Sequence, residues 1–388
     1  MFNILTLNKI SPVATDRFDG AKYRCSDAAQ NPDAVLVRSA SMHDMELPAS
    51  LKAIARAGAG TNNIPIDKCT EAGIAVFNTP GANANAVKEL VLAALLLSSR
   101  KIFPAMQWVQ TLKESDGDIS KQVEKGKSMF VGPEIAGKKL GVIGLGAIGI
   151  LVANAADSLG MKVYGYDPYI SVDAAWGLSR SVVHARSLGE IYENCDYISL
   201  HVPLNPETKG MVNSAAIERM KHGVRILNFS RGELVSTEDI LSALDEKLVR
   251  VYVTDFPSAE MIGHPGVLSI PHLGASTPES EDNCARMAAG ELIDYLENGN
   301  ITNSVNLPNV QMPRSTAIRV GVIHKNIPNM ISSITSEMAR LGINIDNLTN
   351  KSKKDTAYSL LDIAGDFDEQ SAKKLAEIDG IIRVTVYK

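Results

Sequence analysis

The chain has 388 residues, 45% of them hydrophobic, which is enough apolar material for two or three domain cores. Its formal net charge is -5, and 39 basic and 44 acidic residues are mixed along the sequence without a basic tract. This balance argues against nucleic acid and anionic membranes as partners. The cysteines Cys25, Cys69, Cys195 and Cys284 form no CxxC pair and no zinc-ligand spacing, so we expect no metal site.

The first residues form a strand pattern at once and show no secretory leader. The longest apolar run, residues 90–97, is too short to cross a bilayer. We therefore expect a cytoplasmic protein.

The first hundred residues alternate short apolar segments with polar or helical stretches, as expected of a parallel βα-repeating domain. The predicted strands are residues 2–7, 34–37, 53–56 and 75–78. Residues 86–99 then read as a buried helix. The polar segment 113–127 is typical of an exposed crossing between domains, with a hinge.

A glycine-rich loop follows the apolar run at residues 140–143 and opens a helical pattern. Gly144 permits a tight turn, Gly146 lets the backbone approach a pyrophosphate, and Gly149 lets the helix pack closely on its strand. The next strand ends at Asp167, eighteen residues after the last of these glycines, where a carboxylate can accept the ribose hydroxyls of NAD. We favour an NAD site over the alternative that the glycines only shape a turn.

Strand and helix patterns continue downstream and bring the number of strands to six, as in a Rossmann sheet. Ligands are expected at the carboxyl ends of these strands. The candidates there include Val202, Pro203, Phe229, Ser230, Arg231, Asp255, His272 and Gly274.

Oxidation of a carbinol by NAD needs a base for the hydroxyl proton, a cation for a substrate carboxylate and a group that holds the base. His272 is the natural base, although His264 is close enough in sequence to compete. Arg231 can bind a carboxylate with two parallel hydrogen bonds. Glu260 could bond the second ring nitrogen of His272.

Several of these stretches carry a family resemblance, and together they are specific: residues 55–64, 78–81, 144–149, 228–235 and 271–277. Through them the chain resembles the D-2-hydroxyacid dehydrogenases, and within that family the phosphoglycerate dehydrogenases. The resemblance implies Arg231, Glu260 and His272 as the catalytic set and Asp255 near the nicotinamide. It also implies Ala147 and Ile148 as NAD contacts, beside Val202, Phe229 and Ser230.

For the substrate, the resemblance implies that the backbone of Ala59 and Gly60 helps to hold the carboxylate, and that Arg56 recognises a phosphate. One departure is that the family usually has a proline after the glutamate at position 260, where this chain has Met261.

The resemblance implies an α/β fold with a Rossmann NAD-binding domain, residues 99–283, inserted in a flavodoxin-like substrate domain, residues 1–98 and 284–305. The implied reaction is NAD-dependent oxidation of 3-phospho-D-glycerate to 3-phosphooxypyruvate, the first step of L-serine biosynthesis, with the substrate between these two domains. Two alternatives stay open: oxidation of glycerate or another unphosphorylated D-2-hydroxy acid, and an NAD-sensing binding protein without turnover. A homodimer or homotetramer is also expected.

The last segment, residues 316–388, follows a polar linker and has a βαββαβ pattern typical of a ferredoxin-like domain. Its strands are predicted at 318–324, 343–348, 357–363 and 381–387. The segment resembles an ACT domain, a small-ligand regulatory module. The resemblance implies a serine effector held by His324, Asn326 and Asn344, across two copies of the module, or else a module that only joins subunits.

Overall fold

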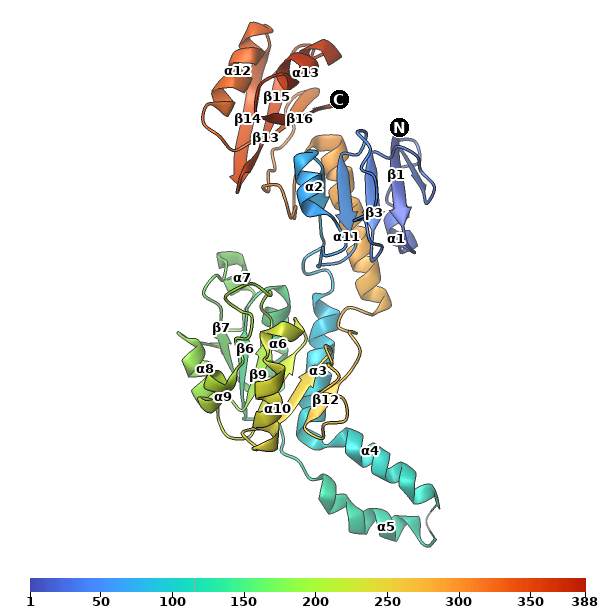
Figure 1. Cartoon of the computed structure of the whole chain (residues 1–388), viewed down its shortest axis with the longest axis vertical. Coiled ribbons are helices and arrows are strands. Elements are labelled where there is room, and N and C mark those ends of the chain that lie inside the picture. The colour runs from blue at the N-terminus through green and yellow to red at the C-terminus, as the bar shows by residue number, and fades with distance from the viewer. Residues whose placement is uncertain (115) are drawn as a thin grey trace. The chain divides into compact units, whose positions relative to one another are not determined.

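The structure is a computed structural model that describes residues 1–114 and 116–388. The chain divides into two compact units, which are described separately (Figure 1). Unit 1 combines Met1–Asn83 with Pro278–Lys388, and unit 2 is Ala84–Thr277. Within the described ranges, none of the helices has the length and apolarity needed to cross a membrane.

Unit 2 is built on a parallel sheet whose strands run in the order β12-β11-β10-β9-β6-β7-β8. The strands are β6 (Lys139–Ile143), β7 (Lys162–Tyr166), β8 (Val183–His184), β9 (Tyr197–Leu200), β10 (Val224–Asn228), β11 (Val249–Thr254) and β12 (Val267–Ser269). The order reverses at β6, as in a Rossmann sheet, so ligands are expected at the carboxyl end of β6. The sequence predicted these strands except β8, a two-residue edge strand that is exposed on both residues.

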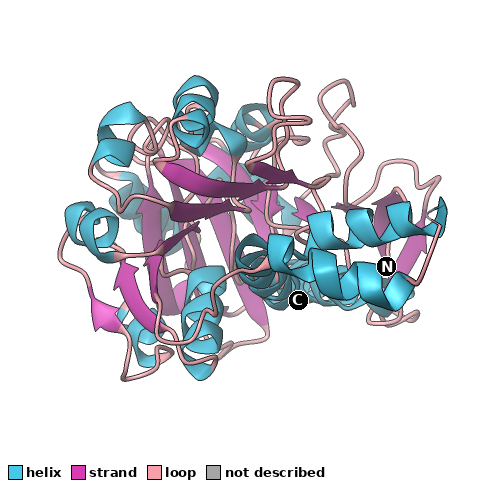
Figure 2. Ribbon diagram, turned by 90° about the horizontal axis from the view of Figure 1, so that it is seen from below, coloured by secondary structure: helices cyan, strands magenta, loops and turns pink. Residues whose placement is uncertain are grey.

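Helices cover both faces of this sheet (Figure 2). α3 (Ala84–Arg100) and α6 (Ala147–Ser158) contribute to one apolar cluster, and α8 (Leu188–Asn194), α9 (Ser214–Glu218) and α10 (Thr237–Asp245) contribute to the other. The central strand β9 is buried along its whole length, because a parallel sheet covered on both faces needs continuous apolar strands. The short helix α7 (Val172–Trp176) follows β7, and a 3₁₀ turn (Gly232–Leu234) follows β10.

A helical arm follows α3 in unit 2 (Figures 1 and 2). It contains α4 (Ile102–Thr111), a 3₁₀ turn (Leu112–Glu114), α5 (Ile119–Gly126) and a second 3₁₀ turn (Lys127–Phe130). The rings of Trp108 and Phe130 pack with their centroids 5.3 Å apart. The expected crossing between domains at 113–127 is therefore wrong. The segment belongs to unit 2, and the Asp118 side chain caps a helix there by accepting from two backbone N–H groups.

The first sheet of unit 1 is parallel, with the order β2-β1-β3-β4-β5 that is typical of flavodoxin-like domains. Its strands are β1 (Phe2–Leu7), β2 (Tyr23–Ser26), β3 (Ala34–Val37), β4 (Ala53–Arg56) and β5 (Ala75–Phe77). The helices are α1 (Pro12–Thr15), α2 (Ile66–Glu71) and the long α11 (Pro278–Asn298), which packs on β3 and β4. The sequence missed β2, because this edge strand buries only Tyr23.

The C-terminal part of unit 1 is a βαββαβ module with the antiparallel order β14-β15-β13-β16, the split βαβ arrangement of ferredoxin-like domains. Its elements are β13 (Ile318–Lys325), α12 (Met330–Arg340), β14 (Asn344–Lys353), β15 (Thr356–Ala364), α13 (Glu369–Ala376) and β16 (Ile381–Tyr387). The predicted element order is confirmed. β14 continues five residues past the predicted end, because it pairs along its length with the buried strand β15.

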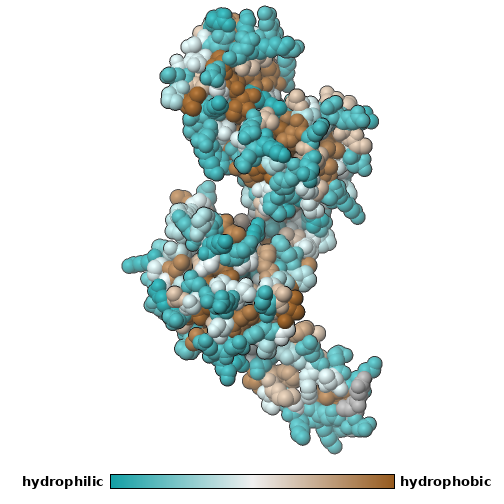
Figure 3. Space-filling model, viewed as in Figure 1, coloured by the Kyte–Doolittle hydropathy of each residue, from teal (hydrophilic) through white to brown (hydrophobic). Residues whose placement is uncertain are grey.

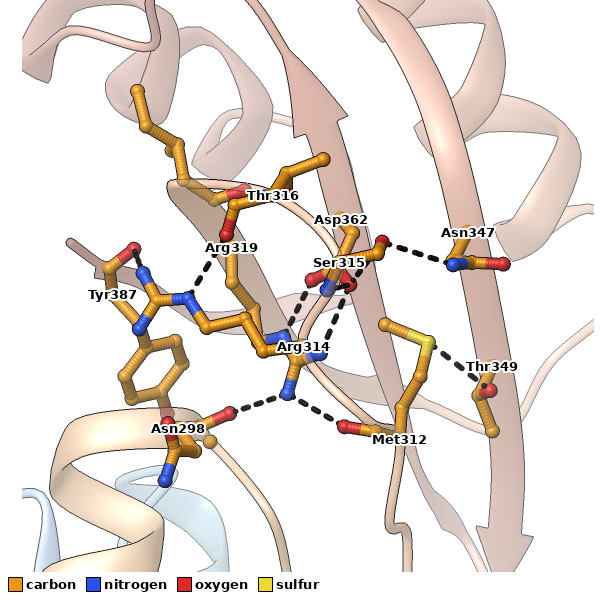
Figure 4. A network of polar contacts seen from close by, with 12 residues as sticks. Asn298, Met312, Arg314, Ser315, Thr316, Arg319, Asn347, Thr349, Asp362 and Tyr387 are labelled. Atoms are coloured by element: carbon orange, nitrogen blue, oxygen red, sulfur yellow. Dashed lines mark hydrogen bonds and ion pairs between the residues drawn. The ribbon is translucent and has the colours of Figure 1, made fainter.

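A buried ion pair between two strands of the C-terminal sheet holds an arginine that also links this sheet to the rest of unit 1 (Figure 4). The guanidinium of Arg319 donates to both carboxylate oxygens of Asp362, at 2.6 and 3.0 Å, and both side chains are fully buried. Arg319 also donates to the backbone oxygens of Asn298, at the end of α11, and of Met312. Each of the three guanidinium nitrogens of Arg319 thus donates at least one hydrogen bond, as a buried charge requires.

An apolar interface reinforces this connection. Tyr358, Leu360 and Tyr387 of the C-terminal sheet belong to the same buried cluster as Phe77 and Tyr295 of the first sheet and α11. The hydroxyl of Tyr358 donates to the backbone oxygen of Gly299 at 2.9 Å. The two sheets of unit 1 therefore share one continuous core.

Candidate functional site

The glycine loop after β6 has the geometry that the sequence predicts. Gly144 has a φ of +92°, and a Cβ there would lie 2.5 Å from the backbone oxygen of His201. A Cβ on Gly149 would collide with the backbone oxygen of Gly144, so α6 can pack this closely only without a side chain. Gly146 is exposed, and a Cβ there would meet no atom within 4 Å. The N-terminus of α6 at Ala147 and Ile148 is thus open to an anion such as a pyrophosphate.

Asp167, at the end of β7, lies beside this loop. Its Oδ2 accepts a hydrogen bond from the N–H of Leu145 at 2.9 Å, and its Oδ1 accepts from the N–H of Tyr169 at 2.8 Å. These bonds fix the carboxylate next to the glycine turn, where the ribose of a dinucleotide is expected. The residues present fit NAD.

The predicted residues after β9 and β10 line the same edge of the sheet. The Cγ1 of Val202 would lie 2.9 Å from a Cβ on Gly144, and the hydroxyl of Ser230 donates to the backbone oxygen of Leu200 at 2.7 Å. Phe229 is buried in the core, whereas Pro203 is exposed. The neighbouring His201 is partly buried, and desolvation lowers its pKa to about 4 and keeps it neutral, so it is a poor candidate for the base.

His272 lies in an exposed loop with Asp255 and Arg231 nearby. Burial raises the pKa of Asp255, while the charges of His272 and Arg231 and the N–H of Gly274 counteract this rise. The N–H of Gly274 lies 3.3 Å from Asp255 Oδ2, and Asp255 Oδ1 is buried without a hydrogen-bond partner in the described chain. An imidazole, a guanidinium and a carboxylate therefore lie close enough to interact electrostatically at the carboxyl end of β11.

Two features of this cluster were not predicted. The sequence placed Asp255 at the nicotinamide and did not connect it with His272. The ring of Phe256 packs against the His272 ring with centroids 4.7 Å apart, which orients the imidazole. The only sequence signal for either was their position after a predicted strand.

Glu260 is fully exposed, and the nearby Ser258 hydroxyl lowers its pKa. Among the described residues, no hydrogen bond or ion pair joins Glu260 to the His272 ring. The alternative base, His264, instead faces Asp245, with its Nε2 3.3 Å from the carboxylate. The role of Glu260 stays a prediction.

In unit 1, Arg56 ends β4, and its Nε donates to the backbone oxygen of Arg38 at 3.0 Å. A Cβ on Gly58 would lie 2.7 Å from the Arg56 guanidinium, so the glycine allows the side chain to fold over its own loop. Arg38 itself, at the end of the paired strand β3, was missed by the sequence reasoning; its guanidinium pairs with Glu281 at 2.6 Å. The register that aligns the ends of β3 and β4 could not be read from the sequence.

The loop predicted to hold the substrate carboxylate, Ala59 and Gly60, follows directly and is partly exposed. The side-chain amide of Asn78, at the end of β5, donates to the backbone oxygen of Ala59 at 2.5 Å. This bond anchors the loop to the neighbouring strand.

The three predicted regulatory residues do not meet within one chain. His324 is buried, and its ring nitrogens contact the Lys325 backbone oxygen at 2.8 Å and the Ser359 hydroxyl at 3.1 Å. Asn326 lies near this end of β13, where its amide donates to the Lys354 backbone oxygen. Asn344 begins β14 at the opposite end of the sheet.

The order of the unit 2 sheet, the glycine loop and the carboxylate after β7 define a dinucleotide-binding domain of the Rossmann type, and the His272 cluster is suited to acid–base chemistry. Residues 92–274 match the family described as D-isomer specific 2-hydroxyacid dehydrogenase, NAD binding domain. The chain belongs to the D-isomer-specific 2-hydroxyacid dehydrogenase family, as its relatives also show.

Two relatives are similar to this chain over most of their length. The D-3-phosphoglycerate dehydrogenase of Haemophilus influenzae is 33% identical over 84% of this chain and 79% of its own length. That of Escherichia coli strain K12 is 34% identical over 84% of this chain and 78% of its own. Among solved structures, the NAD+-bound 3-phosphoglycerate dehydrogenase of Entamoeba histolytica has a TM-score of 0.62 at 26% identity, covering 79% of this chain and 98% of that one.

These findings confirm the prediction of an NAD-dependent oxidoreductase. NAD is the cofactor of unit 2.

Proposed function

We propose that this chain oxidises 3-phospho-D-glycerate to 3-phosphooxypyruvate, the first step of L-serine biosynthesis. The observation that carries the proposal is the cluster of His272, Arg231 and Asp255 in a domain that fits NAD. The similarity of the whole chain to phosphoglycerate dehydrogenases supports the substrate.

His272 is assigned as the base that takes the proton of the C2 hydroxyl, because an imidazole titrates near neutral pH and its ring is reachable from solvent. The nearby carboxylate of Asp255 stabilises the imidazolium that forms. Arg231 binds the substrate carboxylate, and NAD held in unit 2 would supply the acceptor for the hydride that leaves C2. Glu260 is retained as a second candidate partner of the imidazole.

His272→Ala tests this assignment. Its turnover should fall by about 10²- to 10⁴-fold, the usual contribution of a positioned acid–base group, with NAD affinity unchanged. His264→Ala, in the same region, is the matched control and should keep wild-type turnover. NADH formation followed by absorbance is the assay, and equal turnover in the two variants would refute the assignment.

In unit 1 we assign phosphate recognition to Arg56 and carboxylate binding to the backbone of Ala59 and Gly60. Arg56→Met should reduce activity on 3-phosphoglycerate far more than activity on glycerate. An equal reduction on both would favour a dehydrogenase of unphosphorylated D-2-hydroxy acids. Rates of NADH oxidation with phosphorylated and plain hydroxypyruvate make the same comparison in the reverse direction.

The cytoplasmic location of the protein stays a prediction. We also propose that the protein is a homo-oligomer. α4 has no buried residue although most of its side chains are apolar, and such a short helix is marginal without packing. Phe103, Met106 and Val109 are about half exposed, and Met106 and Val109 line a surface pocket together with Leu96 of α3. Figure 3 shows moderately apolar atoms among the hydrophilic ones on the arm. A second copy of the chain is the partner expected to cover this surface, and sedimentation of a Phe103→Glu, Met106→Glu variant tests it.

The C-terminal module is proposed to be an ACT-like regulatory domain. Because His324 and Asn344 lie at opposite ends of one sheet, a serine site built from them needs a second copy of the module. Serine titration of wild type and Asn344→Ala, read as inhibition of NADH formation, tests the effector.

A further inference from the structure

An open surface pocket of about 600 Å³ lies in unit 1 beside the outer edge of the first sheet, and its lining combines polar side chains with the apolar Val305 and Pro308. Its walls come from the end of β5, the segment after α11 and the tip of β14. The polar residues that line it are Asn78, Asn303, Ser304, Asn309, Lys351, Ser352 and Lys353.

One wall carries two ammonium groups. Side chains alternate along a strand, so Asn347, Thr349, Lys351 and Lys353 lie on the same face of β14. Figure 4 shows the first two pointing toward Ser315 and Met312, and their side chains contact these residues. Lys351 and Lys353 lie further along the same face of β14, beyond the residues that contact Met312 and Ser315, and they line the cavity.

The lysines differ in how they are held. The Nζ of Lys353 donates to the backbone oxygen of Ser304 at 2.9 Å, and burial, with a smaller contribution from Lys354, lowers its pKa. Lys351 has no hydrogen bond or ion pair within the residues that the structure describes. A charged group at the cavity wall is therefore available for a ligand.

The opposite wall is uncharged. Asn303 has a left-handed φ of 58°, and its amide nitrogen donates to Glu291 Oε1 at 2.8 Å. Burial raises the pKa of Glu291 to about 8, so this carboxyl is mostly protonated at neutral pH. No acidic residue is among the lining residues. The cavity therefore combines two cations with amide and hydroxyl donors and lacks a compensating anion.

We propose that this cavity binds a small phosphate-type oxyanion, held by Lys351 and Lys353 with the side-chain amides of Asn78, Asn303 and Asn309 as further donors. Ammonium groups bind phosphate as point charges, and neutral amides complete the coordination. The volume admits a small phosphorylated metabolite. This site is distinct from Arg56, which ends the neighbouring strand β4.

Asn78 connects the cavity with the substrate loop. Its amide nitrogen donates to the Ala59 backbone oxygen, while its own N–H contacts the Asn303 oxygen at 3.4 Å. An anion that competes for this amide alters the support of the loop at Ala59 and Gly60. This coupling rests on the proposed function, whereas the binding itself does not.

Isothermal titration of the full-length chain with inorganic phosphate tests the binding. Lys351→Gln changes an exposed side chain that has no hydrogen bond or ion pair among the described residues, so the variant should fold normally. Its affinity for phosphate at this cavity should fall by about tenfold or more, as for a lost charge-assisted hydrogen bond. The double variant Lys351→Gln, Lys353→Gln should lose the site. Lys354→Gln, on the same hairpin but outside the cavity, is the control and should bind as wild type does.

Arg56→Met separates this site from the substrate site. The proposal predicts that phosphate still binds to Arg56→Met and that binding is lost only when the lysine changes are added. If the titration of the double lysine variant coincides with that of wild type, the proposal is wrong, whatever Arg56 does. If Arg56→Met keeps its preference for 3-phosphoglycerate over glycerate while the lysine variants no longer bind phosphate, the proposed substrate role of Arg56 is wrong. The proposed phosphate site in the cavity is then still supported.

Discussion

Glu291 offers a sharp test of how burial sets charge in unit 1. It lies on α11 with 8% of its surface exposed, and its Oε2 has no hydrogen-bond partner among the described residues. Burial raises its pKa from 4.5 to about 8, although the hydrogen bond from Asn303 opposes the rise. We predict that Glu291→Gln, a neutral side chain of the same shape, becomes more stable than wild type as the pH rises.

The sign follows from proton linkage. Below pH 4.5 the carboxyl is protonated in both the folded and the unfolded chain, so the pH has no effect through this group. Between 4.5 and about 8 the folded chain holds a proton that the unfolded chain has released, so the free energy of unfolding falls as pH rises. The slope for one proton is ~1.4 kcal/mol per pH unit, which gives about 3 kcal/mol over two units.

Differential scanning calorimetry of wild type and Glu291→Gln at about pH 5.5 and 7.5 measures this difference. The variant should be more stable than wild type at both pH values, and the midpoints should lie further apart at the higher one. Glu297→Gln on the same helix is a control of opposite sign. Burial would raise the pKa of Glu297, but hydrogen bonds from Lys22 and Tyr23 outweigh it and lower the pKa. That carboxylate stabilises the fold above pH 4.5, and the contribution is lost as pH falls through its folded pKa. Parallel pH dependence in Glu291→Gln and wild type would show that Glu291 is already ionised in the folded chain.

Two further predictions concern the attachment of the C-terminal sheet. Arg319→Met should lower the free energy of unfolding by about 3–5 kcal/mol, because it leaves the buried Asp362 charge unpaired. The double variant Arg319→Met, Asp362→Leu should recover part of this loss. Urea unfolding measures both variants, and a double variant that is no more stable than the single one would contradict the reasoning. Gly299→Ala should lower the free energy of unfolding by more than Gly342→Ala does. Both glycines have φ near +70°, but a Cβ at 299 would lie 2.6 Å from Tyr387, whereas a Cβ at 342 meets nothing within 4 Å. Equal losses in the two variants would mean that the contact with Tyr387 relaxes without cost.

The elements that the sequence predicts well are those whose signal is local. A buried parallel strand is rich in apolar residues, and β9 and β10 were found for this reason. The glycine loop combines three glycines with different backbone requirements, so its structure is determined within six residues. β2 and β8 were not predicted, because edge strands bury few side chains and show little apolar pattern.

The parts that could not be predicted depend on neighbours far away in the sequence. Asp255 faces His272 only because two loops end at the same edge of the sheet. Arg38 lies beside Arg56 through the register of β3 and β4. Glu291 looks like an ordinary helical glutamate, and its burial depends on a segment that returns after α11. The pairing of Glu260 with His272 stays a prediction, because no hydrogen bond or ion pair joins the two side chains among the described residues.

The shared core of unit 1 changes what a ligand on the C-terminal module can do. A module on a flexible tether influences a distant site only through new contacts, whereas this sheet shares Tyr358, Leu360 and Tyr387 with the core that supports β5. Gly299 makes this approach possible, because a side chain there would meet Tyr387 and Leu360. β15 and β5, whose last residue adjoins Asn78, therefore contribute side chains to the same buried cluster. Because packed interiors transmit strain, a change in the packing of β15 acts directly on this cluster.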